Sequence, residues 1–307
     1  MNHFIDIKDI TAQELLALLD LADLLKAERK AGMRHNQLAG KTLGMIFAKS
    51  STRTRISFEV GMMQLGGQAL YLNAQDIQLG RGESVSDTAR VLSRFIDAIM
   101  IRTFAHSDVL DLAEYGSIPV INGLTDLMHP CQALADLMTI REHKGRLRGL
   151  KLAYLGDGNN VANSLLQACA RAGMDIAVAS PDGYTCDPAC IADSKAEAER
   201  QGCSVILTDD PLLAAEGADV LYTDTWVSMG QESEKAKRTA IFGRYQVNDD
   251  IMAAAAAGAI FLHCLPAYRG LEVSASVIDG PASVVFDEAE NRLHAQKAVL
   301  LQLLAPQ

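Results

Sequence analysis

The feature that most constrains this chain is a regular alternation of short apolar runs with segments whose apolar residues recur at helical spacing. Strands that alternate with helices form mostly parallel sheets covered by helices on both faces, so the pattern predicts an α/β fold. The expected strands are 43–48, 69–72, 97–101, 118–121, 152–155, 175–179, 204–207, 219–222 and 259–262. The expected helices are 11–28, 53–65, 85–95, 107–115, 131–144, 160–172, 188–201, 247–257 and 289–304.

The alternation falls into two series, which predicts two domains. The break lies near Gly145–Gly149. Residues 1–145 and 146–307 are therefore expected to form two Rossmann-like domains, each a mostly parallel sheet flanked by helices, in line with the ~100–200 residues usual for one domain. We expect the final helix, about 289–304, to pack back on the first domain. Thr11 with Glu14 forms a capping-box pattern at the first helix, and Gly173 ends the helix at 160–172.

The balance of charge argues against several kinds of partner. The chain has 28 Lys and Arg against 38 Asp and Glu, a formal charge of −10. Proteins that bind nucleic-acid phosphates usually present a basic face, so we expect no nucleic-acid partner. The sequence has no run of about 18 apolar residues and no secretory pattern in MNHFIDIKDI. We therefore expect no membrane segment and a cytoplasmic location.

The six cysteines are scattered, and in a reducing compartment they should be thiols. Cys186 and Cys190 could form half of a zinc site. No second Cys or His pair has ligand-like spacing, so we expect no metal.

A polar segment follows the first expected strand and begins the next helix. It reads Ser51-Thr52-Arg53-Thr54-Arg55. Backbone N–H groups at a helix start favour an anion, and hydroxyl and guanidinium groups add donors. An ordinary N-cap with solvated arginines is the alternative. Because one hydroxyl suffices for a cap, we favour a phosphate site.

Three further polar junctions follow or precede expected elements. Arg102-Thr103 follows strand 97–101, and His129-Pro130-Cys131-Gln132 precedes a helix. His129 and Gln132 could bind a carbonyl or an anion, or could be a capping histidine and a surface glutamine. His263-Cys264-Leu265-Pro266 follows a buried strand. Cys264 could be inert or functional, and the Leu265-Pro266 bond could be cis.

The segment Gly156-Asp157-Gly158 resembles part of a dinucleotide fingerprint. It lies after a strand and before a helix, and Asp182 follows at a suitable distance. Val161 replaces the third glycine, however, so an NAD-dependent dehydrogenase is a weaker interpretation.

Taken in order, the four polar junctions closely resemble the aspartate/ornithine carbamoyltransferase superfamily over essentially the whole chain. Asp224-Thr225-Trp226-Val227-Ser228-Met229-Gly230 is similar to the signature of the ornithine branch, as is His-Cys-Leu-Pro at 263–266. The aspartate branch uses a lysine in the loop matching Gln78–Glu83, which has none here.

The resemblance implies transfer of a carbamoyl group from carbamoyl phosphate to the δ-amino group of L-ornithine, giving citrulline and phosphate in arginine metabolism. It implies no cofactor, and a homotrimer whose subunits share active sites through Gln78. The implied contacts of carbamoyl phosphate are Ser51, Thr52, Arg53, Thr54, Gln78, Arg102, His129, Gln132, Cys264, Leu265 and Arg292. The implied contacts of ornithine are Asn160, Asp224, Ser228, Met229 and Cys264. The implied catalytic residues are Cys264, Asp224, Arg102 and His129.

Two other kinds of function stay open beside the dehydrogenase. The acceptor could be putrescine, N-acetylornithine, N-succinylornithine or aspartate, although Asp224 and Ser228 favour a full α-amino acid. The chain could also be a binding protein without activity. A silent relative would be expected to have lost at least one residue of the full set Arg53, Arg102, His129, Gln132 and Cys264.

Overall fold

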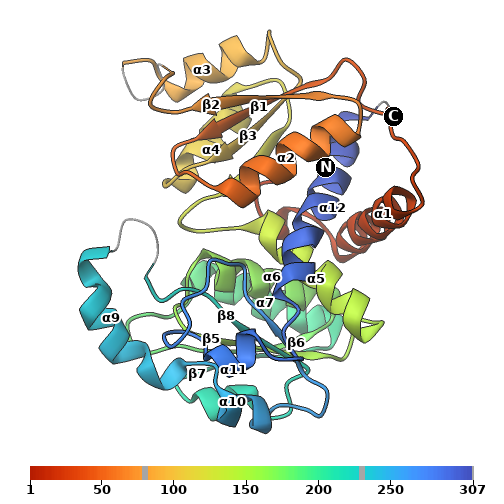
Figure 1. Ribbon diagram of the computed structural model, residues 1–307. Coiled ribbons are helices and arrows are strands. Elements are labelled where there is room, and N and C mark those ends of the chain that lie inside the picture. The colour runs from red at the N-terminus through yellow and green to blue at the C-terminus, as the bar shows by residue number, and fades with distance from the viewer. Residues whose placement is uncertain (78–81, 228–231, 306–307) are drawn as a thin grey trace. The chain divides into compact units, whose positions relative to one another are not determined.

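The computed structural model describes residues 1–77, 82–227 and 232–305. The chain divides into two compact units, one made of Met1–Met138 with Glu290–Gln307 and the other of Thr139–Ala289. Each unit contains its own sheet, in which all pairings between named strands of the described residues are parallel. The predicted α/β fold with two mostly parallel, helix-flanked sheets is confirmed (Figure 1).

The first unit contains a four-stranded sheet of order β2-β1-β3-β4. Its strands are β1 (Thr42–Phe47), β2 (Gln68–Asn73), β3 (Ala98–Arg102) and β4 (Val120–Leu124). Its helices are η1 (Ile7–Asp9), α1 (Ala12–Lys30), α2 (Thr52–Gln64), α3 (Val85–Leu92) and α4 (His106–Tyr115), with the first part of α5 (Pro130–Lys144) and the last part of α12 (Val285–Leu304).

Local capping explains where α1 begins. The Thr11 hydroxyl accepts from the Glu14 N–H at 3.1 Å, and the Glu14 carboxylate accepts from the Thr11 N–H at 2.8 Å. The predicted capping box is therefore present. Lys26 of α1 donates to Asn291 of α12 at 2.8 Å, so the C-terminal helix packs beside α1 as the sequence led us to expect (Figure 1).

The second unit contains a five-stranded sheet of order β7-β6-β5-β8-β9. Its strands are β5 (Lys151–Leu155), β6 (Asp175–Ala179), β7 (Val205–Thr208), β8 (Val220–Thr223) and β9 (Ile260–Leu262). Its other helices are α6 (Asn160–Ala172), α7 (Pro188–Gln201), α8 (Pro211–Ala215), η2 (Glu232–Glu234), α9 (Lys235–Phe242), η3 (Gly243–Tyr245), α10 (Asp249–Ala254) and α11 (Ala275–Ile278).

The strand order determines where a ligand can bind in each unit. In the first sheet, the chain leaves β1 toward β2 on one side and leaves β3 toward β4 on the other. In the second sheet, it leaves β5 toward β6 and β8 toward β9 in the same divergent way. Such switch points open a crevice at the carboxyl ends of the two central strands. Of the four predicted polar junctions, those after β1 and β3 lie at the switch point of the first sheet. His129–Gln132 follows β4 and His263–Pro266 follows β9, which are edge strands next to β3 and β8.

Some element boundaries differ from the sequence prediction. The strand expected at 118–121 is β4, which continues to Leu124 through Asn122 and Gly123. The Asn122 amide is buried and donates to the Ile5 carbonyl at 3.0 Å. A Cβ on Gly123 would lie 2.5 Å from the Met100 sulfur, so this strand position needs glycine. Because Asn122 and Gly123 interrupt the apolar pattern expected of a buried strand, the sequence prediction ended this strand too early.

Two helices also differ in length from the prediction. The helix expected at 247–257 is only Asp249–Ala254, because Asn248 caps it and Ala255 returns to an extended conformation. The last helix begins four residues before the expected 289, at Val285. Within the described residues, no helix is both long and apolar enough to cross a membrane.

Candidate active site

The start of α2 forms the candidate anion site of the first unit. Ser51 is the N-cap, and its hydroxyl accepts from the Thr54 N–H at 3.3 Å. Arg55 takes no part in this cradle, because it pairs with Glu59 at 3.0 Å and lies 3.9 Å from the ring centre of Tyr71. The segment Ser51–Arg55 therefore has two parts. Residues 51–54 form the helix start with its hydroxyls and Arg53, and Arg55 is a surface residue outside the candidate anion site.

A buried hydrogen-bond network connects this helix start to two distant segments. The Arg292 guanidinium donates to the Thr54 hydroxyl at 3.2 Å and to the Gln132 side-chain oxygen at 2.6 Å. The three side chains are 3 % or less exposed. Residues from α2, α5 and α12 therefore meet in the first unit. The family resemblance implied all three as contacts of the same substrate.

Three arginines influence His129, which precedes α5 and is 4 % exposed. Burial lowers the pKa of His129 well below its usual value. The positive charges of Arg292, Arg102 and Arg53 lower this pKa further. His129 is therefore neutral at pH 7, and a neutral imidazole can donate one hydrogen bond to a carbonyl oxygen.

This environment predicts a pH-dependent stability. The unfolded chain protonates His129 near pH ~6.5, whereas the folded chain keeps it neutral to lower pH. The unfolded state then binds more protons, so stability falls as the pH drops below about 6.5. In His129→Gln, the slope of the unfolding free energy against pH should decrease by up to about 1.4 kcal/mol per pH unit. Urea unfolding between pH 5 and 8 measures both slopes.

A second buried histidine also makes the stability of the folded chain depend on pH, but it does not affect the comparison of the two slopes. Burial and the charge of Lys297 lower the pKa of His294 to about 4. This contribution is present in the wild type and in His129→Gln alike, so it cancels in the difference of slopes. Equal slopes would mean that His129 binds protons equally well in the folded and unfolded chain, and would contradict the arrangement of charges described above.

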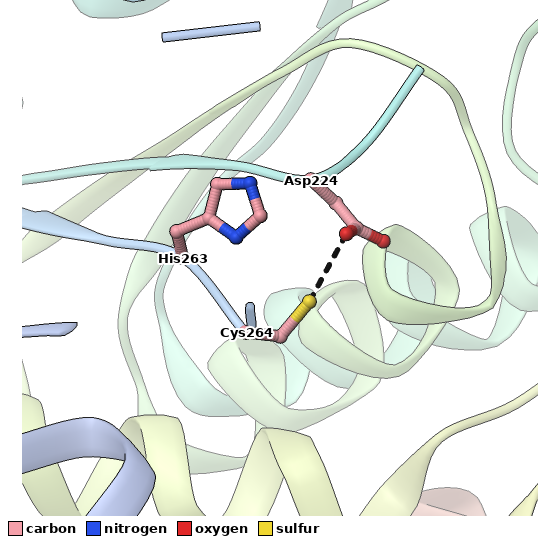
Figure 2. Close-up of side chains that lie close together, drawn as sticks. All are labelled: Asp224, His263 and Cys264. Atoms are coloured by element: carbon pink, nitrogen blue, oxygen red, sulfur yellow. Dashed lines mark hydrogen bonds between the residues drawn. The ribbon is translucent and has the colours of Figure 1, made fainter. Parts of the chain in front are cut away.

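In the second unit, Asp224 and Cys264 form the candidate site. Asp224 follows β8, Cys264 follows β9, and Figure 2 shows the thiol pointing at the carboxylate. The Cys264 thiol donates to Asp224 Oδ1 at 3.0 Å, and the Thr225 N–H donates to the same oxygen at 2.7 Å. The Asn159 amide donates to Oδ2 at 2.8 Å. Both oxygens of a carboxylate that is 9 % exposed are thus oriented.

Asn159 is a residue that the sequence analysis missed. Its side-chain oxygen caps α6 by accepting from the N–H groups of Val161 and Ala162, while its amide reaches Asp224. Asn160, which the resemblance implied for ornithine, is the first residue of α6. The pair Asn159-Asn160 gave no way to tell the capping residue from its neighbour, since asparagine suits both positions.

The His263–Pro266 loop is held by buried groups of the second unit. His263 is fully buried, and its Nδ1 accepts from the Leu265 N–H at 2.9 Å. Its Nε2, which must then carry the proton, lies 3.4 Å from the Glu272 carboxylate. Leu265 has φ 57°, unusual for a residue with a side chain, and the Leu265-Pro266 bond is cis. The hydrogen bond from Leu265 to buried His263 therefore orders the loop that contains Cys264.

Asp224, His263 and Cys264 are also close enough to be considered as a metal site. One ligand atom from each lies within 4.8 Å of the others. Both ring nitrogens of His263 face groups of the protein, however, and the Cys264 thiol donates to Asp224. Binding a metal would therefore require the thiol to lose its proton and His263 to give up one of these contacts.

The Gly156-x-Gly158 segment does not form a pyrophosphate site in this structure. A Cβ on Gly158 would lie 2.2 Å from the Cys186 nitrogen and 2.7 Å from the Thr185 oxygen. In a dinucleotide fingerprint, the second glycine admits the ligand. Here the chain itself occupies that space, which explains the glycine without a nucleotide.

The remaining implied site residues have definite places in the sequence of elements. Arg102 ends β3, Thr52 and Arg53 begin α2, and Leu265 belongs to the loop after β9. Gln78, Ser228 and Met229 lie outside the described residues.

These features describe a two-unit α/β protein with a candidate anion site in one unit and an oriented carboxylate–thiol pair in the other. Two family models match the chain: the carbamoyl-phosphate-binding domain of the aspartate/ornithine carbamoyltransferases over residues 2–142, and their Asp/Orn-binding domain over residues 148–303. The chain belongs to the aspartate/ornithine carbamoyltransferase family.

Individual relatives are similar over almost their full length. A protein named ornithine carbamoyltransferase from Symbiobacterium thermophilum is 59 % identical, and the match covers 99 % of this chain and 98 % of the relative. The solved structure of the ornithine carbamoyltransferase from Pyrococcus furiosus has a TM-score of 0.96 at 55 % identity, covering 99 % and 97 %. The anabolic ornithine carbamoyltransferase from Campylobacter jejuni has a TM-score of 0.93 at 42 % identity, covering 99 % of both chains.

Proposed function

We propose that the chain transfers the carbamoyl group of carbamoyl phosphate to the δ-amino group of L-ornithine, giving L-citrulline and phosphate. The single observation that carries this proposal is the oriented Asp224 carboxylate beside the Cys264 thiol, at the switch point of the second sheet. A carboxylate at this place suits the α-ammonium of an amino acid. The names of the similar proteins support the same substrate.

The first unit is assigned to carbamoyl phosphate. The phosphate is bound by Ser51, Thr52, Arg53, Thr54 and Arg102, which supply hydroxyls, a helix start and permanent positive charge. The carbamoyl end is bound by His129 and Gln132, and Arg292 contacts carbamoyl phosphate between this end and the cradle, because it donates to both Gln132 and Thr54. The convergence of three guanidinium charges on buried His129 supports this assignment, because such a concentration of charge is suited to a dianion.

The second unit is assigned to ornithine, with Asn160, Asp224, Ser228, Met229 and Cys264 as contacts. Leu265 and Cys264 also contact the carbamoyl group in this proposal. The δ-amine is mostly protonated at neutral pH, since alkylamines have pKa values near ~10.4. We assign the removal of the amine's proton to the Cys264–Asp224 pair. The pair can accept this proton once the Cys264 thiol has lost its own.

The reaction then follows the ordinary course of acyl transfer. The neutral δ-nitrogen attacks the carbonyl carbon, and a C–N bond forms as the carbonyl oxygen gains negative charge. Arg102, His129 and the Thr54 hydroxyl donate to this oxygen. The carbonyl then re-forms as the C–O bond to phosphate breaks, and phosphate leaves with the electron pair and takes up the second proton from the nitrogen. Losing one such donor typically lowers turnover by about a hundredfold or more.

We further propose a cytoplasmic homotrimer in which Gln78 completes the site of a neighbouring subunit. Large apolar side chains exposed on the first unit support an interface there, among them Phe95 at 76 % and Met63 at 67 % exposure. A solution mass three times that of the 33.0 kDa chain would agree with this assembly.

A colorimetric assay for ureido products tests the function. Carbamoyl phosphate with ornithine should yield citrulline and phosphate in equal amounts. Carbamoyl phosphate with putrescine, N-acetylornithine, N-succinylornithine or aspartate should yield little product. Product from one of these amines alone would preserve the role of the first unit and overturn the assignment of Asp224.

A further inference from the structure

We infer that Asp136 is a positioning residue that sets the orientation of the Gln132 amide toward the carbamoyl group. Asp136 lies in α5, one turn after Gln132, and is fully buried. Its Oδ1 accepts from Gln132 Nε2 at 2.7 Å. The inference rests on the proposed function, because it concerns how the carbamoyl end of carbamoyl phosphate is recognised.

The chemistry of the two neighbours determines which way the Gln132 amide points. A carboxylate only accepts hydrogen bonds, so the group facing Asp136 must be the amide NH₂. A guanidinium only donates, so the group facing Arg292 must be the amide oxygen. Asp136 and Arg292 therefore fix the same orientation from opposite ends. Neither could satisfy a reversed amide.

This orientation matters because of what the carbamoyl group presents. Its NH₂ is a donor, so Gln132 can bind it only through the side-chain oxygen. An amide oxygen accepts up to two hydrogen bonds, and the proposed site uses one for Arg292 and one for the carbamoyl NH₂. A reversed amide would place donor against donor. Asp136 thus gives the site selectivity for a carbamoyl phosphate over a phosphate that lacks the NH₂.

The same network limits the effect of Asp136 to one end of the substrate. Arg292 contacts Thr54 directly, and Thr54 is tied to Ser51 by a 3.1 Å bond between their hydroxyls. These contacts do not pass through Asp136. Loss of Asp136 should therefore weaken binding of the carbamoyl end and leave the phosphate cradle intact.

The test compares carbamoyl phosphate with inorganic phosphate in the full-length wild type and in Asp136→Leu. We expect kcat/KM for carbamoyl phosphate to fall about tenfold to a hundredfold, as for loss of a hydrogen bond to a charged group. The inhibition constant of inorganic phosphate should change less than about twofold, because the cradle contacts remain. Asp136→Asn, whose oxygen can still accept from Gln132, should recover activity to within about threefold of the wild type.

A double-mutant cycle and a control separate positioning from stability. In a Gln132→Met background, Asp136→Leu should cost less than about twofold further, because its effect acts through Gln132. Asn122→Leu removes another buried hydrogen bond of the first unit, to the Ile5 carbonyl, and should leave both constants unchanged. If Asp136→Leu does not fold, Asp136→Ala replaces it in the same measurements.

Each outcome has a definite meaning. A selective loss for carbamoyl phosphate, with rescue by Asp136→Asn, supports the inference. Equal weakening of carbamoyl phosphate and inorganic phosphate, or an additive loss in the Gln132→Met background, overturns it. A wild-type protein that forms no citrulline would refute the proposed function itself, whereas citrulline formation with an unaffected Asp136→Leu would refute only the role of Asp136.

Discussion

Asp224→Ala is expected to lower kcat/KM for ornithine by about a hundredfold to a thousandfold, the range found when one partner of a buried charged pair is removed. Asp224 accepts hydrogen bonds from Cys264, Asn159 and the Thr225 backbone. Its loss removes the proposed partner of the α-ammonium and releases the thiol. The KM for carbamoyl phosphate should change less than about threefold, because its phosphate contacts lie in the other unit.

Two further variants show whether the charge of Asp224 is what matters. Asp224→Asn keeps the shape and one acceptor oxygen, and should still lose most of the activity if the ammonium needs a negative partner. Asp187→Ala removes another aspartate of the second unit, one that caps α7, and should leave KM for ornithine unchanged. Equal loss for ornithine and carbamoyl phosphate in Asp224→Ala would contradict the assignment of the two units.

Arg292→Met is expected to weaken carbamoyl phosphate and inorganic phosphate alike, by about a hundredfold or more. The change removes a buried positive charge and leaves the Thr54 hydroxyl and the Gln132 oxygen without this donor. Competition between inorganic phosphate and carbamoyl phosphate in the citrulline assay measures both affinities. KM for ornithine should stay close to the wild-type value.

Arginine at this position does more than supply charge. Arg292→Lys keeps the charge but cannot donate to Thr54 and Gln132 with the geometry of a guanidinium fork, so it should recover only part of the affinity. Arg55→Met serves as the matched control, since Arg55 belongs to the same motif as Arg53 yet pairs with Glu59 on the surface. If Arg55→Met weakened phosphate as strongly as Arg292→Met, the division of the motif would be wrong.

The sequence was most informative where function depends on neighbouring residues. Ser51, Thr54 and the start of α2 could be predicted because a strand, hydroxyls and a helix start follow one another directly. Cys264 could be singled out in the same way, since it immediately follows a strand of a parallel sheet, whereas Asp224 was implied only by the family resemblance. Element order places the start of α2 and Asp224 at switch points of the two sheets, where physical reasoning about parallel sheets expects a ligand.

Pairings between distant segments could not be derived from spacing. Arg292 meets Gln132 from 160 residues away, and only the family resemblance implied that they share a substrate. Asp136 is an ordinary polar residue of the helix expected at 131–144, and its contact with Gln132 became apparent only from the structure. Asn159 was missed because Asn160 beside it suits a helix start equally well.

The most direct measurement compares kcat/KM for ornithine, N-acetylornithine, N-succinylornithine, putrescine and aspartate at saturating carbamoyl phosphate. We expect citrulline formation from ornithine, with kcat/KM at least about a hundredfold above that of any other acceptor, as expected when a buried charged partner is left unpaired. A comparable value for putrescine, which lacks the α-carboxylate, or for N-acetylornithine, which lacks the free α-amino group, would show that Asp224 and its neighbours do not recognise a full α-amino acid.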